Sequence, residues 1–122
     1  MDFIYKDLTY KILGAAMDVH NELGCGFLEK VYENSLCIRL KELKLHTESQ
    51  KAINVIFHDV KVGEYFADIV VENKVILELK TVRKIDEIHE AQILNYLKAT
   101  GFRIGYILNF ANRKLEHRRF VL

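Results

Sequence analysis

The amino-acid sequence predicts a single α/β domain built around a mixed β-sheet. Three observations predict this class: two helical patterns near the N-terminus, three strand-like runs after them, and a third helical pattern that leads into a buried strand. Antiparallel strands that meet a crossover helix and a further strand give a sheet of mixed direction. With 122 residues, of which 50% are apolar, the chain has room for one compact domain, expected over residues 1–122.

The first two elements are predicted to be helices. Apolar residues recur at helical spacing from Leu8 to Leu23, and Gly24 follows as a candidate C-cap. A second, amphipathic pattern begins at Leu28 and continues to about Leu45. Two helices are therefore expected to precede the sheet.

The remaining elements follow from alternation, turn residues and glycine. Polar turns at His58-Asp59 and Glu72-Asn73-Lys74 separate runs of β-branched residues, and Gly101 stops a third helical pattern. We expect strands over residues 47–57, 65–71 and 75–79, a helix over 85–100, and strands over 103–110 and 117–122.

Asp68 falls in the second expected strand, and Glu78 and Lys80 fall at the end of the third. Side chains alternate along a strand, so Glu78 and Lys80 point to the same side of the sheet. If the loop between the strands has three residues and Val71 lies opposite Val75, Asp68 faces Glu78 directly. A two-residue loop would place the acids on opposite faces.

Two neighbouring carboxylates repel each other and are costly to bury unless a cation lies between them. Hard oxygen ligands suit Mg²⁺ or Mn²⁺ better than zinc. The pair of Asp68 and Glu78 therefore indicates a divalent-metal site. The alternative is a solvated strand face that carries a Glu-Lys pair.

Two further pairs lie on the expected helices. Gly26, Glu29 and Tyr32 form the pattern G-x-x-E-x-x-Y, and Gln92 and Tyr96 lie four residues apart. Residues at these spacings are neighbours on one helix face. The alternative is structural: Glu29 stabilises a helix N-terminus, and the tyrosines pack with their hydroxyls in water.

An Asp-x(n)-Glu-x-Lys pattern on a β-hairpin resembles the PD-(D/E)XK nuclease superfamily, and the four motifs together resemble its GxxExxY family from about His20 to Phe110. The resemblance implies a restriction-endonuclease-like αβββαβ core. It also implies Mg²⁺- or Mn²⁺-dependent hydrolysis of phosphodiester bonds in nucleic acid, with DNA the expected substrate. Cys25 departs from the family, which usually has proline there.

The resemblance also implies roles for single residues. His20 matches the family's histidine and is a candidate for contact with metal-bound water or phosphate, with a structural role as the alternative; Tyr32 is a further candidate. The implied metal ligands are Asp68, Glu78 and the backbone carbonyl of Leu79, and the implied catalytic residues are Glu29, Lys80, Gln92 and Tyr96.

Charge is balanced at a formal +1, so affinity for nucleic acid requires a local basic patch. The candidates for phosphate contact, each weighed against an ordinary solubilising charge, are Arg83, Lys84, Arg118 and Arg119. We expect a cytoplasmic protein without a membrane helix or signal peptide, and free thiols at Cys25 and Cys37.

Two other function classes stay open at this point: a non-catalytic nucleic-acid-binding module and a protein-interaction module, both keeping the nuclease fold. The sequence also leaves open DNA or RNA, internal or terminal cutting, one or two metal ions, and a homodimer or an unknown protein partner.

Overall fold

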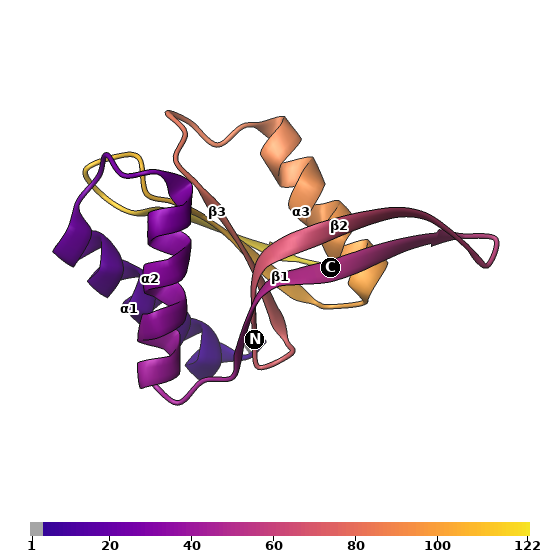
Figure 1. The fold of residues 1–122 in the computed structure, drawn as a ribbon, viewed down its shortest axis with the longest axis horizontal. Coiled ribbons are helices and arrows are strands. Elements are labelled where there is room, and N and C mark those ends of the chain that lie inside the picture. The colour runs from indigo at the N-terminus through magenta and orange to yellow at the C-terminus, as the bar shows by residue number, and fades with distance from the viewer. Residues whose placement is uncertain (1–3) are drawn as a thin grey trace.

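Within residues 4–122, the part of the chain that the structure describes, five strands form one sheet in the order β1-β2-β3-β4-β5 (Figure 1). The structure is a computed structural model, and residues 1–3 of the expected domain lie outside it. β3 and β4 run parallel and the other neighbours antiparallel, so the predicted α/β domain with a mixed sheet is confirmed. The elements are α1 (Lys6–Leu23), α2 (Glu29–Glu42), β1 (Thr47–Phe57), β2 (Val60–Val71), β3 (Val75–Lys80), α3 (Glu87–Thr100), β4 (Ile104–Asn109) and β5 (Glu116–Val121).

The sheet separates two layers of helices. α1 and α2 cover one face and α3 covers the other, as Figure 1 shows. Alternate side chains of β3 supply both cores: Leu77 packs in the cluster with α1 and α2, and Ile76 packs with Leu97 of α3. A charged side chain on a strand buried on both faces therefore needs a partner.

The two N-terminal helices end in different ways. α1 ends at Gly24, whose φ of 70° confirms it as the C-cap. α2 ends at Glu42, before the predicted limit near Leu45, because Lys44 adopts a left-handed φ of 65°. The amide of Leu45 then donates to the carbonyl of Leu40 at 3.1 Å. This bond pattern ends a helix without the glycine that usually marks the site.

β1 and β2 form a hairpin that is longer than the sequence pattern indicates. The turn at His58-Asp59 is confirmed, and φ values of 48° and 65° suit a two-residue hairpin turn. β2 begins at Val60 instead of residue 65, because pairing continues to Phe57 and Val60 although Gly63 interrupts the alternation. Figure 1 shows the far end of this hairpin projecting from the body of the molecule.

The connection between β2 and β3 is the predicted three-residue loop. Glu72 and Asn73 adopt φ values of 53° and 52°, and Val71 pairs with Val75. The register that brings Asp68 opposite the end of β3 is therefore confirmed for this loop.

α3 is held against the sheet by its cap and by one glycine. Asp86 accepts hydrogen bonds from the first turn, and His89 completes a capping box, so the helix begins slightly later than predicted and ends at the predicted Gly101. A Cβ on Gly105 of β4 would lie 2.8 Å from Cδ1 of Ile93. A larger residue at position 105 would therefore force the Ile93 side chain to shift, and Ile93 follows directly after Gln92.

Tyr32 and His20 are buried in the α1–α2 layer. The Tyr32 hydroxyl donates to the Gly24 carbonyl at 2.6 Å and accepts from the Phe27 amide at 3.2 Å, so the alternative that this hydroxyl lies in water is wrong. The Tyr32 ring stacks on Phe110 at 4.6 Å. Nε2 of His20 lies 2.8 Å from the carbonyl of Asn112. Both candidate residues thus have structural partners.

We expect Tyr32→Phe to lower the free energy of unfolding by about 1–2 kcal/mol, because the Gly24 carbonyl and the Phe27 amide lose a shared partner. Urea denaturation of both proteins measures this difference. An unchanged stability together with lost catalytic function would instead assign Tyr32 to the chemistry.

Candidate active site

Asp68 and Glu78 lie where β2 and β3 separate. Strand pairing ends at Ile69 and Leu77, and beyond that point the two acids replace backbone bonds. The amide of Asp68 donates to Oε2 of Glu78 at 2.8 Å, and the amide of Leu79 donates to Oδ2 of Asp68 at 2.8 Å. Each carboxylate thus bonds the strand that carries the other, and this exchange holds the acids side by side.

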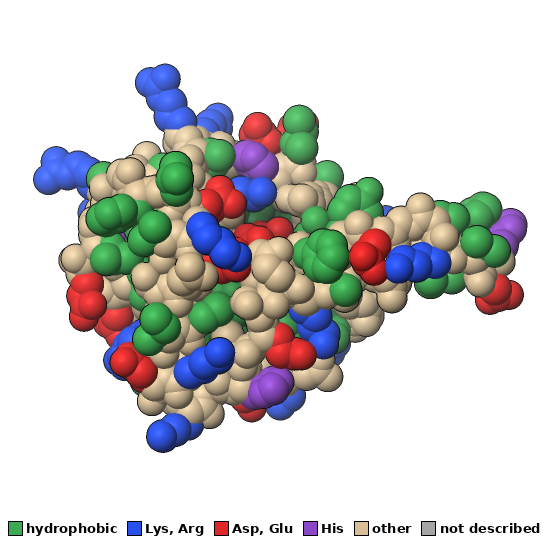
Figure 2. All heavy atoms as spheres, viewed as in Figure 1, with side chains coloured by type: hydrophobic (Ala, Val, Ile, Leu, Met, Phe, Trp, Pro, Cys, Tyr) green, Lys and Arg blue, Asp and Glu red, His purple; other side chains and the backbone are tan. Residues whose placement is uncertain are grey.

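The two acids repel each other in a partly closed site. Figure 2 shows acidic side chains recessed in the middle of one face, between the helical part and the hairpin. Burial, and then the neighbouring Asp68 carboxylate, raises the pKa of Glu78 to about 8. Burial also raises the pKa of Asp68, although the hydrogen bond from the Leu79 amide opposes this shift.

Glu29 approaches this pair from the first turn of α2. Burial raises the pKa of Glu29, whereas the charge of Lys80 and a backbone hydrogen bond from Thr81 lower it. The carboxylate of Asp68 contributes a further rise. Glu29 therefore lies within electrostatic reach of both β2 and β3, as its position in the sequence pattern predicts.

A chain of polar contacts connects β3 to α3. Nζ of Lys80 lies 3.4 Å from Oε1 of Gln92, and Nε2 of Gln92 donates to the Tyr96 hydroxyl at 3.0 Å. Burial and the Glu78 carboxylate raise the pKa of Tyr96. The structure thus brings five of the predicted residues together with Asp68 around the end of β3: Glu29, Glu78, Lys80, Gln92 and Tyr96.

Two residues at the site were not predicted from the sequence. Glu33 is only 5% exposed, and Gln50 donates to its carboxylate at 3.1 Å. The same Nε2 of Gln50 lies 3.4 Å from Oδ1 of Asp68. Glu33 follows Glu29 by four residues on α2, and this spacing was a usable signal. No sequence pattern marks Gln50, because its contact with Asp68 depends on the pairing of β1 with β2.

The oxygen-rich site suits a hard divalent cation. The carboxylates of Glu78, which is buried, and Asp68, which is partly buried, have raised pKa values and gain most from a neighbouring positive charge. As arranged, no three His, Cys, Asp or Glu side chains within residues 4–122 form a ready metal-binding group.

Two of the predicted basic residues lie in the loop that follows β3. Arg83 and Lys84 are exposed in the loop after β3. The buried side chain of Asn109 anchors this loop, since its amide donates to the Val82 carbonyl at 2.7 Å and its oxygen accepts from the Val82 amide at 3.1 Å. Both charges therefore stay near the end of β3.

The two C-terminal arginines have partners within the protein. Arg118 pairs with Glu90 at 2.6 Å and with Glu116 at 3.5 Å. Arg119 donates to the Tyr106 hydroxyl at 2.9 Å and to a backbone carbonyl near the start of α1 at 3.1 Å. The structure does not bring Arg119 and the acid pair together, because these contacts turn it toward α1.

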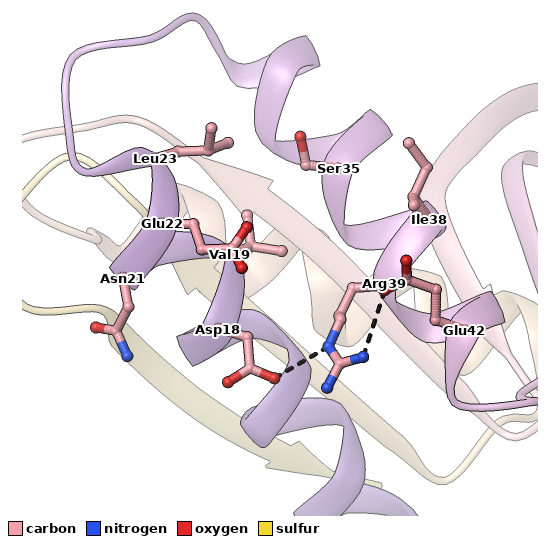
Figure 3. Close-up of a pocket in the computed structure, with 9 residues that line it drawn as sticks. All are labelled: Asp18, Val19, Asn21, Glu22, Leu23, Ser35, Ile38, Arg39 and Glu42. Carbon is pink, nitrogen blue, oxygen red and sulfur yellow. Dashed lines mark hydrogen bonds and ion pairs between the residues drawn. The ribbon is translucent and has the colours of Figure 1, made fainter.

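A separate hollow lies between α1 and α2. Figure 3 shows Arg39 of α2 reaching across it to the carboxylate of Asp18 on α1, at 3.0 Å, and pairing with Glu42 of its own helix, at 3.3 Å. Glu22 adds a third acid to its lining. Acids outnumber the one arginine there, so this hollow repels a phosphate backbone.

A family model described as the PD-(D/E)XK nuclease superfamily matches residues 6–120. A sheet of this topology with two acids and a lysine on its β2–β3 hairpin defines an α/β domain of the nuclease type. The chain belongs to the PD-(D/E)XK nuclease superfamily.

Other comparisons bear on the fold. The crystal structure of SSO0001 is similar, with a TM-score of 0.58 and 18% sequence identity over 75% of this chain and 48% of that one. This chain thus spans about half of that relative, and the likeness supports the fold alone. No curated protein matches the chain. No helix in residues 4–122 is long and apolar enough to cross a membrane.

We expect the metal-free protein to lose stability as pH rises, and Glu78→Gln to remove part of this loss. The pKa of Glu78 lies near 8 in the folded protein and near 4.5 when unperturbed, so the folded state binds the extra proton between these values. The free energy of unfolding therefore falls from pH 4.5 to pH 8. Denaturant titrations of both proteins across this range measure the difference, which should favour Glu78→Gln at the upper end.

Magnesium supplies the matched control for this experiment. Mg²⁺ should raise the melting temperature of the wild type, whereas Glu78→Gln and Asp68→Asn should gain nothing beyond the effect of equal ionic strength. A large loss of stability in both metal-free variants would mean that the acids are structural.

Proposed function

We propose that this protein is a divalent-metal-dependent nuclease that hydrolyses phosphodiester bonds in DNA. The observation that carries this proposal is the position of the buried Glu78 beside the partly buried Asp68, with Lys80 two residues after Glu78 on the same strand. The repulsion between two neighbouring carboxylates destabilises the folded state unless a cation binds between them. Membership of a nuclease superfamily supports phosphodiester hydrolysis as that use.

Asp68 and Glu78, together with the backbone carbonyl of Leu79, would hold Mg²⁺ or Mn²⁺. When bound, such an ion polarises a phosphodiester oxygen and lowers the pKa of a water molecule. Among residues 4–122, the hydrogen-bond contact of Oδ1 of Asp68 is with Gln50, at 3.4 Å, so this oxygen has no strong competing partner there. Gln50 and Glu33 would keep Asp68 in this orientation.

The remaining residues divide the chemistry between them. Glu29 would accept a hydrogen bond from the attacking water, since its raised pKa makes it a stronger base than an ordinary glutamate. Lys80 would donate to the phosphoryl oxygens as negative charge builds on them. Gln92 would hold the Lys80 ammonium, and the Tyr96 hydroxyl would fix Gln92.

Within the superfamily, we propose that the chain belongs to the GxxExxY family. Two contacts support this. Tyr32 closes the loop from Gly24 to Phe27, and that loop leads directly into Glu29. The motif would therefore serve to place its glutamate at the mouth of the site.

Lys80→Ala should abolish cleavage while leaving affinity for DNA and metal nearly intact, because an interaction made mainly in the transition state affects rate and not binding. Cleavage of labelled single- and double-stranded DNA in Mg²⁺ or Mn²⁺ measures the first effect, and metal calorimetry and DNA binding measure the others. If Lys80→Ala cuts as fast as the wild type, or if the wild type neither cuts nor binds nucleic acid, a protein-interaction function replaces this proposal.

Replacement of both Arg83 and Lys84 by alanine should weaken DNA binding equally for all sequences. Each lost phosphate contact should reduce the slope of log affinity against log salt by roughly one unit. The matched control replaces Lys11 and Lys41, two exposed lysines of α1 and α2, by alanine. Equal losses in both double variants would show only a general effect of charge.

A further inference from the structure

A second hollow lies between the projecting hairpin and α3. It has a volume of about 750 Å³ and is lined by residues of β1, β2 and α3. Two of its residues, Gln92 and Tyr96, belong to the chain of contacts that starts at Lys80. The hollow therefore shares part of its wall with the proposed active site.

The lining of this hollow combines an apolar surface with a few polar groups, which suits the flat faces and polar edges of a nucleobase. Its aliphatic residues are Val55, Ile56, Ile88, Ala91 and Ala99. Tyr65 of β2 is 52% exposed, and its ring lies 5.8 Å from that of Tyr96. Asn54 and Asn95 add side-chain amides from opposite walls, and these can both donate and accept hydrogen bonds. The one charged side chain in the lining is Lys98. This hollow lacks the acids of the α1–α2 hollow.

We propose that the hollow binds an unstacked nucleobase of a single-stranded segment next to the scissile phosphate. The base would stack on Tyr65, while Asn54 and Asn95 would bond to its edge. Lys98 would contact a phosphate of the same strand. This inference rests on the proposed nuclease function, because it makes the hollow part of the same substrate site.

Position on the fold favours a nucleic-acid strand over a protein as the occupant. Gln92 lies between the hollow and Lys80, so a strand whose base fills the hollow passes the acid pair with its backbone. A base inside a duplex is stacked and paired, and it must leave the helix to reach such a pocket. Single-stranded DNA, ends and flaps should therefore bind more tightly than intact duplex.

Binding measured without metal tests this inference separately from cleavage. We expect Tyr65→Ser to weaken binding of a fluorescent single-stranded DNA roughly 5- to 100-fold, the usual loss for one stacked base. The slope of log affinity against log salt should stay the same, because no phosphate contact is lost. Tyr65→Phe should keep the wild-type affinity. Ile38→Ala, which shortens an exposed apolar side chain in the α1–α2 hollow, is the matched control.

Abasic DNA identifies the base itself. One abasic position should weaken wild-type binding as much as Tyr65→Ser does, and the same position should have no further effect in Tyr65→Ser. Thermal melts check folding, and Asn95→Ala, on the helix wall, repeats the test if Tyr65→Ser is unstable. Wild-type affinity in both variants, or an abasic effect that persists in them, would overturn the inference.

The outcomes also separate this inference from the nuclease proposal. If the protein binds a base through Tyr65 but does not cut DNA, the base site is supported and the nuclease proposal is wrong. DNA cleavage that is unchanged in the Tyr65 and Asn95 variants would instead support the nuclease proposal and overturn the base site. A dimer in light scattering that Tyr65→Ser dissociates would assign the hollow to a second copy of the chain and overturn the inference.

Discussion

The arrangement of the candidate site depends on two hydrogen bonds at the point where β2 and β3 separate: the Asp68 amide donates to the Glu78 carboxylate, and the Leu79 amide donates to the Asp68 carboxylate. A continuous ladder would give more regular pairing and would not bury two like charges. The chain instead ends the ladder at Ile69 and Leu77 and fills the gap with carboxylates. The three-residue loop fixes this register, and a change of one residue in its length would separate the acids.

The other elements bring their polar groups to this gap. α2 begins with Glu29 because Tyr32 closes the loop before it, and Glu33 on the next turn reaches Asp68 through Gln50. α3 approaches the sheet from the other face, where the Ile93 side chain fills the space that a side chain on Gly105 would take. α2 and α3 lie on opposite faces of the sheet. Both can contribute residues to one site because β2 and β3 separate there.

Sequence reasoning succeeded where the signal is local. The limits marked by Gly24 and Gly101, the loop after β2 and the spacing of the acids each follow from a few adjacent residues. It failed where a contact joins distant segments: Gln50 meets Asp68 only after β1 pairs with β2, and Asn109 supports the loop after β3 from a neighbouring strand. The end of α2 was missed for a different reason, since Lys44 takes a left-handed conformation that its residue type does not favour.

The long hairpin explains how a chain of this size can hold both a metal site and a substrate site. Tyr65 and Asp68 lie on β2 about 10 Å apart along the strand, given its rise per residue. One continuous strand thus connects the wall of the hollow to the acid pair. α3 provides the opposite wall with Tyr96 and carries Gln92 to Lys80. A shift of the hairpin relative to α3 would therefore alter the metal site and the hollow together. The packing of the hairpin against α3 is thus a second constraint on the geometry of the site.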